Sequence, residues 1–84
     1  MIIVTADDYG KNRIATDSIH ECFSKKRITC ASAMVFMEDS TRAAAIASKS
    51  DLELGLHLNF TMPFNTPDVP PEVCEKQGKV ISYL

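Results

Sequence analysis

Three short apolar stretches, separated by two stretches of helical character, constrain the fold of this 84-residue chain most strongly. The first, residues 2–6 (IIVTA), is continuously apolar or β-branched, as in a strand that is buried on both faces of a parallel sheet. The second spans residues 28–36, and the third, residues 52–60, alternates leucines with polar residues. Strands that alternate with helices form parallel sheets with right-handed crossovers. We therefore predict an α/β fold with the element order β-α-β-α-β.

The two stretches between these strands carry the signals of helix starts. Asn12 is suited to cap a helix over about residues 13–25, because its side-chain oxygen can accept a hydrogen bond from a free backbone N–H in the first turn. Asp39 or Ser40 can cap a second helix over about residues 41–49, which is rich in alanine.

Residues 62–84 differ in character from the rest of the chain. All four prolines lie here, and the hydrophobic residues follow no clear period. Long irregular segments in small domains are usually functional. We expect a proline-rich loop region over residues 62–84, with a short hairpin or strand near residues 79–84. At this length the chain forms one domain, residues 1–84.

Composition and charge indicate a soluble protein of the cytoplasm. The net charge is −2, which gives no electrostatic reason to expect nucleic acid or an anionic membrane as a partner. No secretory signal and no apolar stretch of membrane-spanning length is present. The three cysteines are widely spaced and include no CxxC pair, so we expect reduced thiols rather than a zinc finger.

Two adjacent aspartates and a histidine are the candidates for chemistry. Asp7 and Asp8 follow the first predicted strand, and His57 lies near the end of the third. Parallel sheets bind ligands at the carboxyl ends of their strands, so these side chains could converge. Asp8 and His57 would offer an oxygen and a nitrogen to a divalent cation such as Zn²⁺ or Mg²⁺. Asp7 could then accept a proton from an attacking water.

Simpler interpretations of the same residues stay open at this point. Two aspartates after a strand often form a solvated turn or a helix cap, and a histidine on the polar face of a strand is often structural. Receiver domains also hold Mg²⁺ with an acidic pair after their first strand. They need an acceptor aspartate at the end of the third strand, whereas Asp51 lies at its start.

The motifs TADDYG at residues 5–10 and GLHLNFT at residues 55–61 together resemble the YdjC-like carbohydrate deacetylase family, which includes chitooligosaccharide deacetylases. The similarity in order and spacing runs over residues 1–61, and the later segment KQGKVISYL also resembles that family. The resemblance implies a TIM-barrel-like α/β fold. It also implies metal-dependent hydrolysis of an N-acetyl group from an amino sugar or oligosaccharide, with acetate and a free amine as products.

The resemblance assigns a role to each candidate residue. Asp7 matches the catalytic base, Asp8 the metal-binding carboxylate and His57 the first metal-binding histidine. The cofactor is then a divalent ion, Mg²⁺ or Zn²⁺, and the substrate partner an acetylated amino sugar.

The chain is shorter than the proteins of that family, and the family's second metal histidine has no counterpart among its residues. We therefore expect a partial TIM-barrel-like sheet, truncated relative to the family. Such a sheet exposes apolar surface and favours a homo-oligomer. The alternative to an active deacetylase is a non-catalytic truncated α/β module that self-associates.

Overall fold

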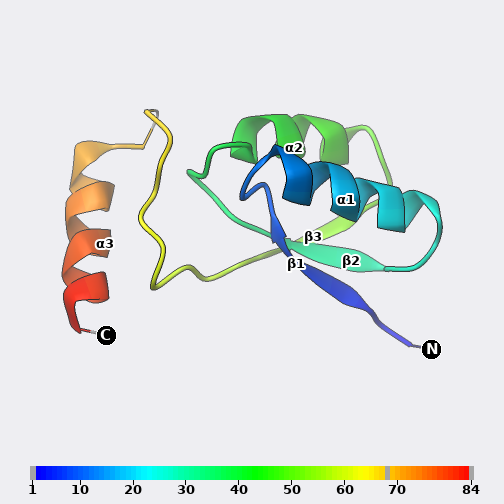
Figure 1. Cartoon of the computed structure of the whole chain (residues 1–84), viewed down its shortest axis with the longest axis horizontal. Helices are drawn as coiled ribbons and strands as arrows, with labels where there is room; N and C mark the ends of the chain where they lie inside the picture. Colours follow the sequence, from blue (N-terminus) through cyan, green and yellow to red (C-terminus); the bar gives the residue numbers. More distant parts are fainter. Residues whose placement is uncertain (1, 68, 84) are drawn as a thin grey trace.

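A three-stranded parallel sheet with both crossover helices on one face forms the main body of the protein (Figure 1). The computed structural model describes residues 2–67 and 69–83. Within them the order is β1 (Thr5–Tyr9), α1 (Arg13–Ser24), β2 (Cys30–Ala33), α2 (Ser40–Ser48), β3 (Glu53–Leu56) and α3 (Pro71–Tyr83). The predicted α/β fold is confirmed. Its open sheet with helices outside one face is consistent with part of a barrel wall.

The strands occupy different residues from those that the apolar runs predicted. β1 pairs with β2 from Thr5 to Tyr9, so the strand includes both aspartates instead of ending before them. β2 and β3 are four residues each, shorter than the predicted 28–36 and 52–60. Hydrophobicity marks which residues can be buried, but hydrogen bonding to the neighbouring strand decides where a strand begins and ends.

The helix starts follow the capping logic of the sequence only in part. Asn12 caps α1 as predicted, because its Oδ1 accepts a hydrogen bond of 2.8 Å from the N–H of Ala15. Asp39 occupies the N-cap position of α2 but makes no capping bond there. Instead, its carboxylate accepts a hydrogen bond from Nε of Arg42, whose Nη2 also binds Asp17 of α1 at 2.7 Å. Arg42 thus ties the two crossover helices together.

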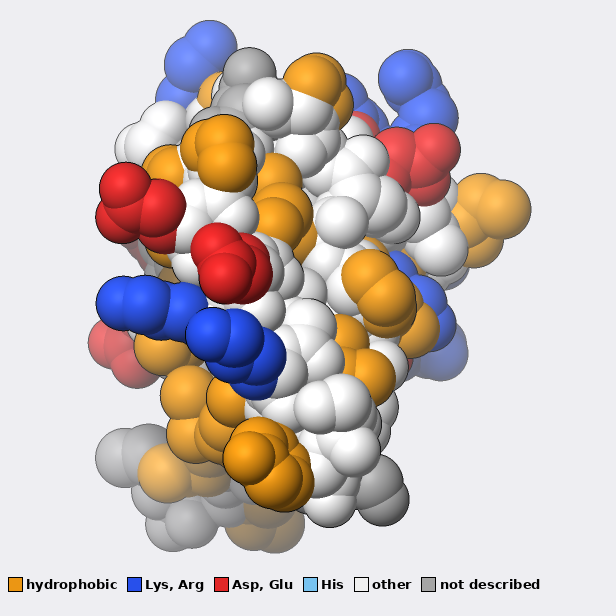
Figure 2. Space-filling model, turned by 90° about the vertical axis from the view of Figure 1, so that its left-hand side faces the viewer, with side chains coloured by type: hydrophobic (Ala, Val, Ile, Leu, Met, Phe, Trp, Pro, Cys, Tyr) orange, Lys and Arg blue, Asp and Glu red, His pale blue; other side chains and the backbone are white. Residues whose placement is uncertain are grey.

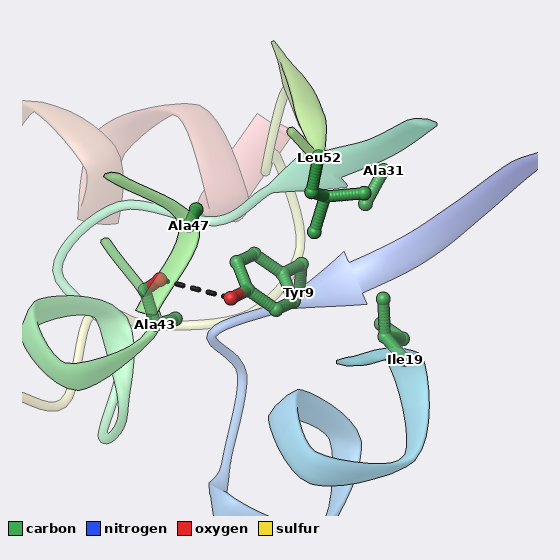
Figure 3. Close-up of a cluster of buried hydrophobic side chains, with 6 residues drawn as sticks. All are labelled: Tyr9, Ile19, Ala31, Ala43, Ala47 and Leu52. Atoms are coloured by element: carbon green, nitrogen blue, oxygen red, sulfur yellow. Dashed lines mark hydrogen bonds between the residues drawn. The ribbon is translucent and has the colours of Figure 1, made fainter. Parts of the chain in front are cut away.

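The core lies between the sheet and α1 and α2. Figure 3 shows its buried side chains, which are Tyr9, Ile19, Ala31, Ala43, Ala47 and Leu52. Tyr9 is fully buried, and its hydroxyl donates a hydrogen bond of 2.9 Å to the backbone oxygen of Ala43 in α2 (Figure 3). The alanines of β2 and α2 let the helix approach the sheet closely enough for this bond. One large aromatic ring therefore anchors the first strand under the second helix.

Residues 71–83 form a helix, α3, so the predicted strand or hairpin near residues 79–84 is wrong for the described residues 79–83. Residue 84 lies outside the described part. Pro71 begins the helix, where the N–H that proline lacks would have no partner within the helix. The negative charge of Glu72 in the first turn interacts favourably with the positive end of the helix dipole. An i,i+4 ion pair between Glu75 and Lys79 supports the exposed face. The cluster of prolines thus marks a helix start and does not extend the loop to the end of the chain.

α3 stands apart from the sheet and contacts the chain segment that leads to it (Figure 1). The side chain of Gln77 accepts a hydrogen bond of 2.9 Å from the N–H of Phe64 and donates one of 3.1 Å to the backbone oxygen of Met62. Figure 2 views this end of the molecule and shows hydrophobic side chains exposed among charged ones. Val80 and Tyr83 are exposed on the helix itself. No helix within residues 2–67 and 69–83 combines the length and apolarity that crossing a bilayer requires.

Gly10 makes the turn from β1 toward α1 possible. Its φ is +89°, and a Cβ built there would lie 3.2 Å from Cα of Ser40 and 3.3 Å from the backbone oxygen of Met34. A side chain would meet both backbone strain and a backbone contact that cannot move aside. We expect Gly10→Ala to lower the free energy of unfolding by about 1–3 kcal/mol. Urea denaturation measures this change.

Gly55→Ala is the matched control for Gly10→Ala. Gly55 lies in β3 with no heavy atom within 4 Å of its would-be Cβ, and its φ is not in the positive region. Its substitution should leave the urea midpoint nearly unchanged. Equal midpoints for Gly10→Ala and the wild type would contradict the role of Gly10 in this turn.

Candidate functional site

A β-bulge in β1 makes the side chains of Asp7 and Asp8 point in different directions. The register runs from Ala6 opposite Ala31 to Tyr9 opposite Ala33, so β1 holds one residue more than β2 between these pairs. Asp8 has a φ of +71°, in the left-handed region that Asp tolerates better than most residues. Bulges turn side chains away from the regular alternation of a strand. Here Tyr9 is turned into the core, and Asp8 is turned toward His57.

Asp8 and His57 meet at the carboxyl end of the sheet. Their side-chain atoms Oδ1 and Nδ1 are 3.4 Å apart, and the backbone N–H of Asp8 donates to the same Nδ1 at 3.4 Å. His57 follows β3, and its own N–H donates to the backbone oxygen of Ala33, which continues the pairing with β2. The structure therefore brings together two residues that are 49 positions apart in the chain.

Both side chains remain accessible from solvent. The Asp8 side chain is 44% exposed and that of His57 is 27% exposed. The imidazole ring is thus partly enclosed, and the carboxylate is the more exposed of the two groups. This combination suits a site that binds a ligand from solution.

Asp7 points from the sheet face that α1 and α2 leave uncovered. Its side chain is exposed, and its Oδ1 accepts a hydrogen bond of 2.8 Å from Oγ of Ser32 in β2. Ser32 is a contact that the sequence did not lead us to expect. The only clue in the sequence is the position of this residue, because Ser32 carries the one hydroxyl of β2 (CASA) and directly follows Ala31. Only the register of β1 on β2 shows that this hydroxyl lies beside Asp7.

The pair of Asp8 and His57 fits a divalent cation by chemistry and by spacing. Two ligand atoms about 2.0–2.1 Å from a tetrahedral ion lie about 3.3–3.4 Å from each other, close to the 3.4 Å between Oδ1 and Nδ1. The corresponding spacing around octahedral Mg²⁺ is about 2.9 Å, which a small rotation of either side chain would reach. Nδ1 accepts a hydrogen bond, so it carries the lone pair that a metal binds. That hydrogen bond is long and therefore weak, so little free energy is lost when Nδ1 binds a metal ion in its place.

The donor set found here is a pair. No group of three or more His, Cys, Asp or Glu side chains placed to hold a metal ion occurs among residues 2–67 and 69–83. A cation held by Asp8 and His57 would therefore keep several coordination positions for water or substrate. Open positions are a feature of catalytic metal sites and not of structural ones.

The fold and the site together define a class of protein. It comprises the α/β proteins that gather ligating and charged side chains at the carboxyl edge of a parallel sheet. The sequence matches the family described as YdjC-like protein over residues 1–83, and the chain belongs to the YdjC-like family. Neither a search of curated proteins nor one of solved structures finds a match to the chain.

Proposed function

We propose that the protein is a metal-dependent hydrolase that removes an N-acetyl group from an amino sugar or oligosaccharide. Membership of the YdjC-like family suggests activity of the carbohydrate deacetylase type. The observation that carries the proposal is the 3.4 Å approach of Asp8 and His57 at the carboxyl end of the sheet. A carboxylate and an imidazole at this spacing support a metal-dependent site, and the carboxylate of Asp7, one residue earlier in the chain, is the candidate for proton transfer.

Asp8 and His57 would hold the divalent cation, Zn²⁺ or Mg²⁺. When bound there, the ion would act as a Lewis acid that polarises the acetyl carbonyl and stabilises negative charge on its oxygen. Asp8 would contribute a formal negative charge, and His57 a neutral nitrogen ligand. The cation also lowers the cost of keeping Asp7 and Asp8 ionised side by side.

Asp7 would act as the general base. In this reaction the oxygen of a water molecule attacks the acetyl carbonyl carbon while Asp7 accepts a proton from that water. The carbon–nitrogen bond then breaks as the nitrogen takes up the proton that Asp7 accepted, which gives the free amino sugar and acetic acid that ionises to acetate. The Asp7 side chain is exposed on the uncovered face of the sheet, where a polar sugar could reach it.

Release of acetate from a chitooligosaccharide tests this function. We expect acetate to form when Zn²⁺ or Mg²⁺ is added to metal-free protein, and its formation to stop when a chelator removes the ion. Acetate can be measured by a coupled enzymatic assay, with the amine product counted separately to establish equal amounts. Absence of both products at saturating metal would contradict the proposal.

Loss of the charged ligand should weaken the metal site. We expect Asp8→Asn to reduce the affinity for Zn²⁺ by at least about tenfold, since the loss of outer-shell partners alone costs about 10–100-fold. Isothermal titration calorimetry measures this affinity. Asp51→Asn is the matched control, because Asp51 is an exposed aspartate just before β3, at the opposite end of the strand from His57. Equal Zn²⁺ affinities for Asp8→Asn and wild type would show that Asp8 is no ligand.

We also propose that copies of the chain associate into a homo-oligomer. β3 is an edge strand of the sheet that the described residues form, and its Leu56 side chain is 64% exposed. Leu54 in the same strand and Leu58 just after it are exposed too. Leucines along an open strand edge favour pairing with a second copy. If the chain releases no acetate, the non-catalytic self-associating module becomes the better description.

Sedimentation velocity over a range of micromolar concentrations tests this association. We expect a dimer that dissociates on dilution, and we expect Leu56→Lys to shift the protein to the monomer. Ile14→Lys serves as the control, because Ile14 is at least as exposed as Leu56 but lies on α1 and not in β3. A monomer at every concentration would contradict the association.

A further inference from the structure

A hydrogen bond across two strands holds the carboxylate of Asp7. Oγ of Ser32 donates to Oδ1 of Asp7 at 2.8 Å, which is short enough for a well-formed bond to a carboxylate. Ala6 and Ala31 pair one step earlier, so the register brings Asp7 beside Ser32 directly before the bulge. On its other side, Ser32 pairs with Gly55 of β3, so it lies in the central strand of the sheet. The bond therefore depends on the sheet and not on a loop.

The contact acts on one oxygen of the carboxylate and leaves the other free. A serine hydroxyl has a single proton to donate, and here Oδ1 receives it. Oδ2 then keeps its lone pairs for a proton from another donor. A bond at the protein surface contributes little net stability, since water can replace it. Its larger effect is on direction, because an exposed aspartate without a partner would sample several rotamers.

We propose that Ser32 is a positioning residue for Asp7. This inference rests on the proposed function, in which Asp7 is the general base. Ser32 holds the carboxylate in one rotamer through Oδ1 and leaves Oδ2 to accept a proton. The bulge at Asp8 turns the next side chain toward His57, so the two neighbouring carboxylates are aimed separately. Ser32 fixes the direction of the first, and the left-handed backbone fixes that of the second.

Side-chain couplings test the position of Asp7 without any catalysis. Three-bond couplings between the backbone nitrogen and Cγ of Asp7 report its χ1 rotamer by NMR. We expect values of a single rotamer in the wild type, averaged values in Ser32→Ala, and single-rotamer values again in Ser32→Thr, which keeps the hydroxyl. Unchanged couplings in Ser32→Ala would overturn the proposal.

Kinetics test whether the position matters for the reaction. We expect Ser32→Ala to lower kcat by about 10–100-fold, in line with the cost of misplacing a reacting group. KM and Zn²⁺ affinity should stay within a few-fold, and Ser32→Thr should recover most of kcat. Ser48→Ala, at an exposed serine of α2, is the control for loss of a hydroxyl. A normal kcat in Ser32→Ala despite averaged couplings would overturn the positioning role.

The two measurements separate the failure of this inference from that of the proposed function. A wild-type protein that releases no acetate refutes the deacetylase activity. The couplings then decide on their own whether Ser32 holds Asp7.

Discussion

Asp7→Asn is expected to reduce acetate release by about 10²–10⁴-fold, the usual contribution of a general base. Asparagine has nearly the same shape as aspartate, and its amide oxygen can still accept the hydrogen bond from Ser32. It cannot accept a proton from water at neutral pH. The substitution therefore removes the base and leaves its position intact. The measurement is kcat for a chitooligosaccharide at saturating Zn²⁺.

The Zn²⁺ affinity of Asp7→Asn distinguishes the role of Asp7 from that of Asp8. If Asp8 is the ligand and Asp7 the base, Asp7→Asn should bind Zn²⁺ within a few-fold of wild type. Glu38→Gln, at an exposed acid between β2 and α2, controls for the loss of one negative charge. A kcat for Asp7→Asn equal to that of Glu38→Gln would refute the role of Asp7. A large loss of Zn²⁺ affinity would instead make Asp7 a ligand.

Tyr9→Ala is expected to destabilise the fold by about 3–5 kcal/mol, as large-to-small substitutions of buried aromatics do. The ring is fully buried between the sheet and α2, and its hydroxyl bonds to Ala43 (Figure 3). A domain of 84 residues has a total stability of only about 4–13 kcal/mol. The variant should therefore be partly or fully unfolded, which circular dichroism and urea denaturation would detect.

Tyr9→Phe divides this loss between packing and hydrogen bonding. It keeps the ring and removes the hydroxyl, so we expect a cost of about 0.5–1.5 kcal/mol. Burial raises the pKa of Tyr9 above its ordinary 10.0, against the opposing charge of Arg42. The unfolded chain then ionises first, so the wild type should lose stability as the pH rises above about 10. Tyr9→Phe should lack that loss. A Tyr9→Ala protein as stable as Tyr9→Phe would contradict the core described here.

The sequence predicted the element order because local patterns encode it. The β-branched run before Asp7 and the capping Asn12 each indicate their element without reference to distant residues. The meeting of Asp8 with His57 could also be anticipated, because the carboxyl ends of parallel strands share one edge of a sheet. What the sequence could not provide was any feature that depends on register.

Register-dependent features appeared only in the structure. The extra residue in β1 arises from how β1 pairs with β2, and the left-handed conformation of Asp8 follows from that pairing. The bond from Ser32 to Asp7 depends on the same register. α3 is a different case, since Pro71 followed by twelve residues without proline is a recognisable helix start. The closely spaced prolines before α3 led to the prediction of a loop instead of a helix.

Titration of the protein with Zn²⁺, followed through the imidazole nitrogens by NMR, tests the central proposal most directly. The chain has two histidines, so His20 on α1 is an internal control for His57. We expect the Nδ1 resonance of His57 to shift and to saturate with one ion per chain, while His20 stays unchanged and Asp8→Asn weakens the response. A His57 resonance that does not respond to Zn²⁺, or one that responds no more than His20, would contradict a metal site formed by Asp8 and His57.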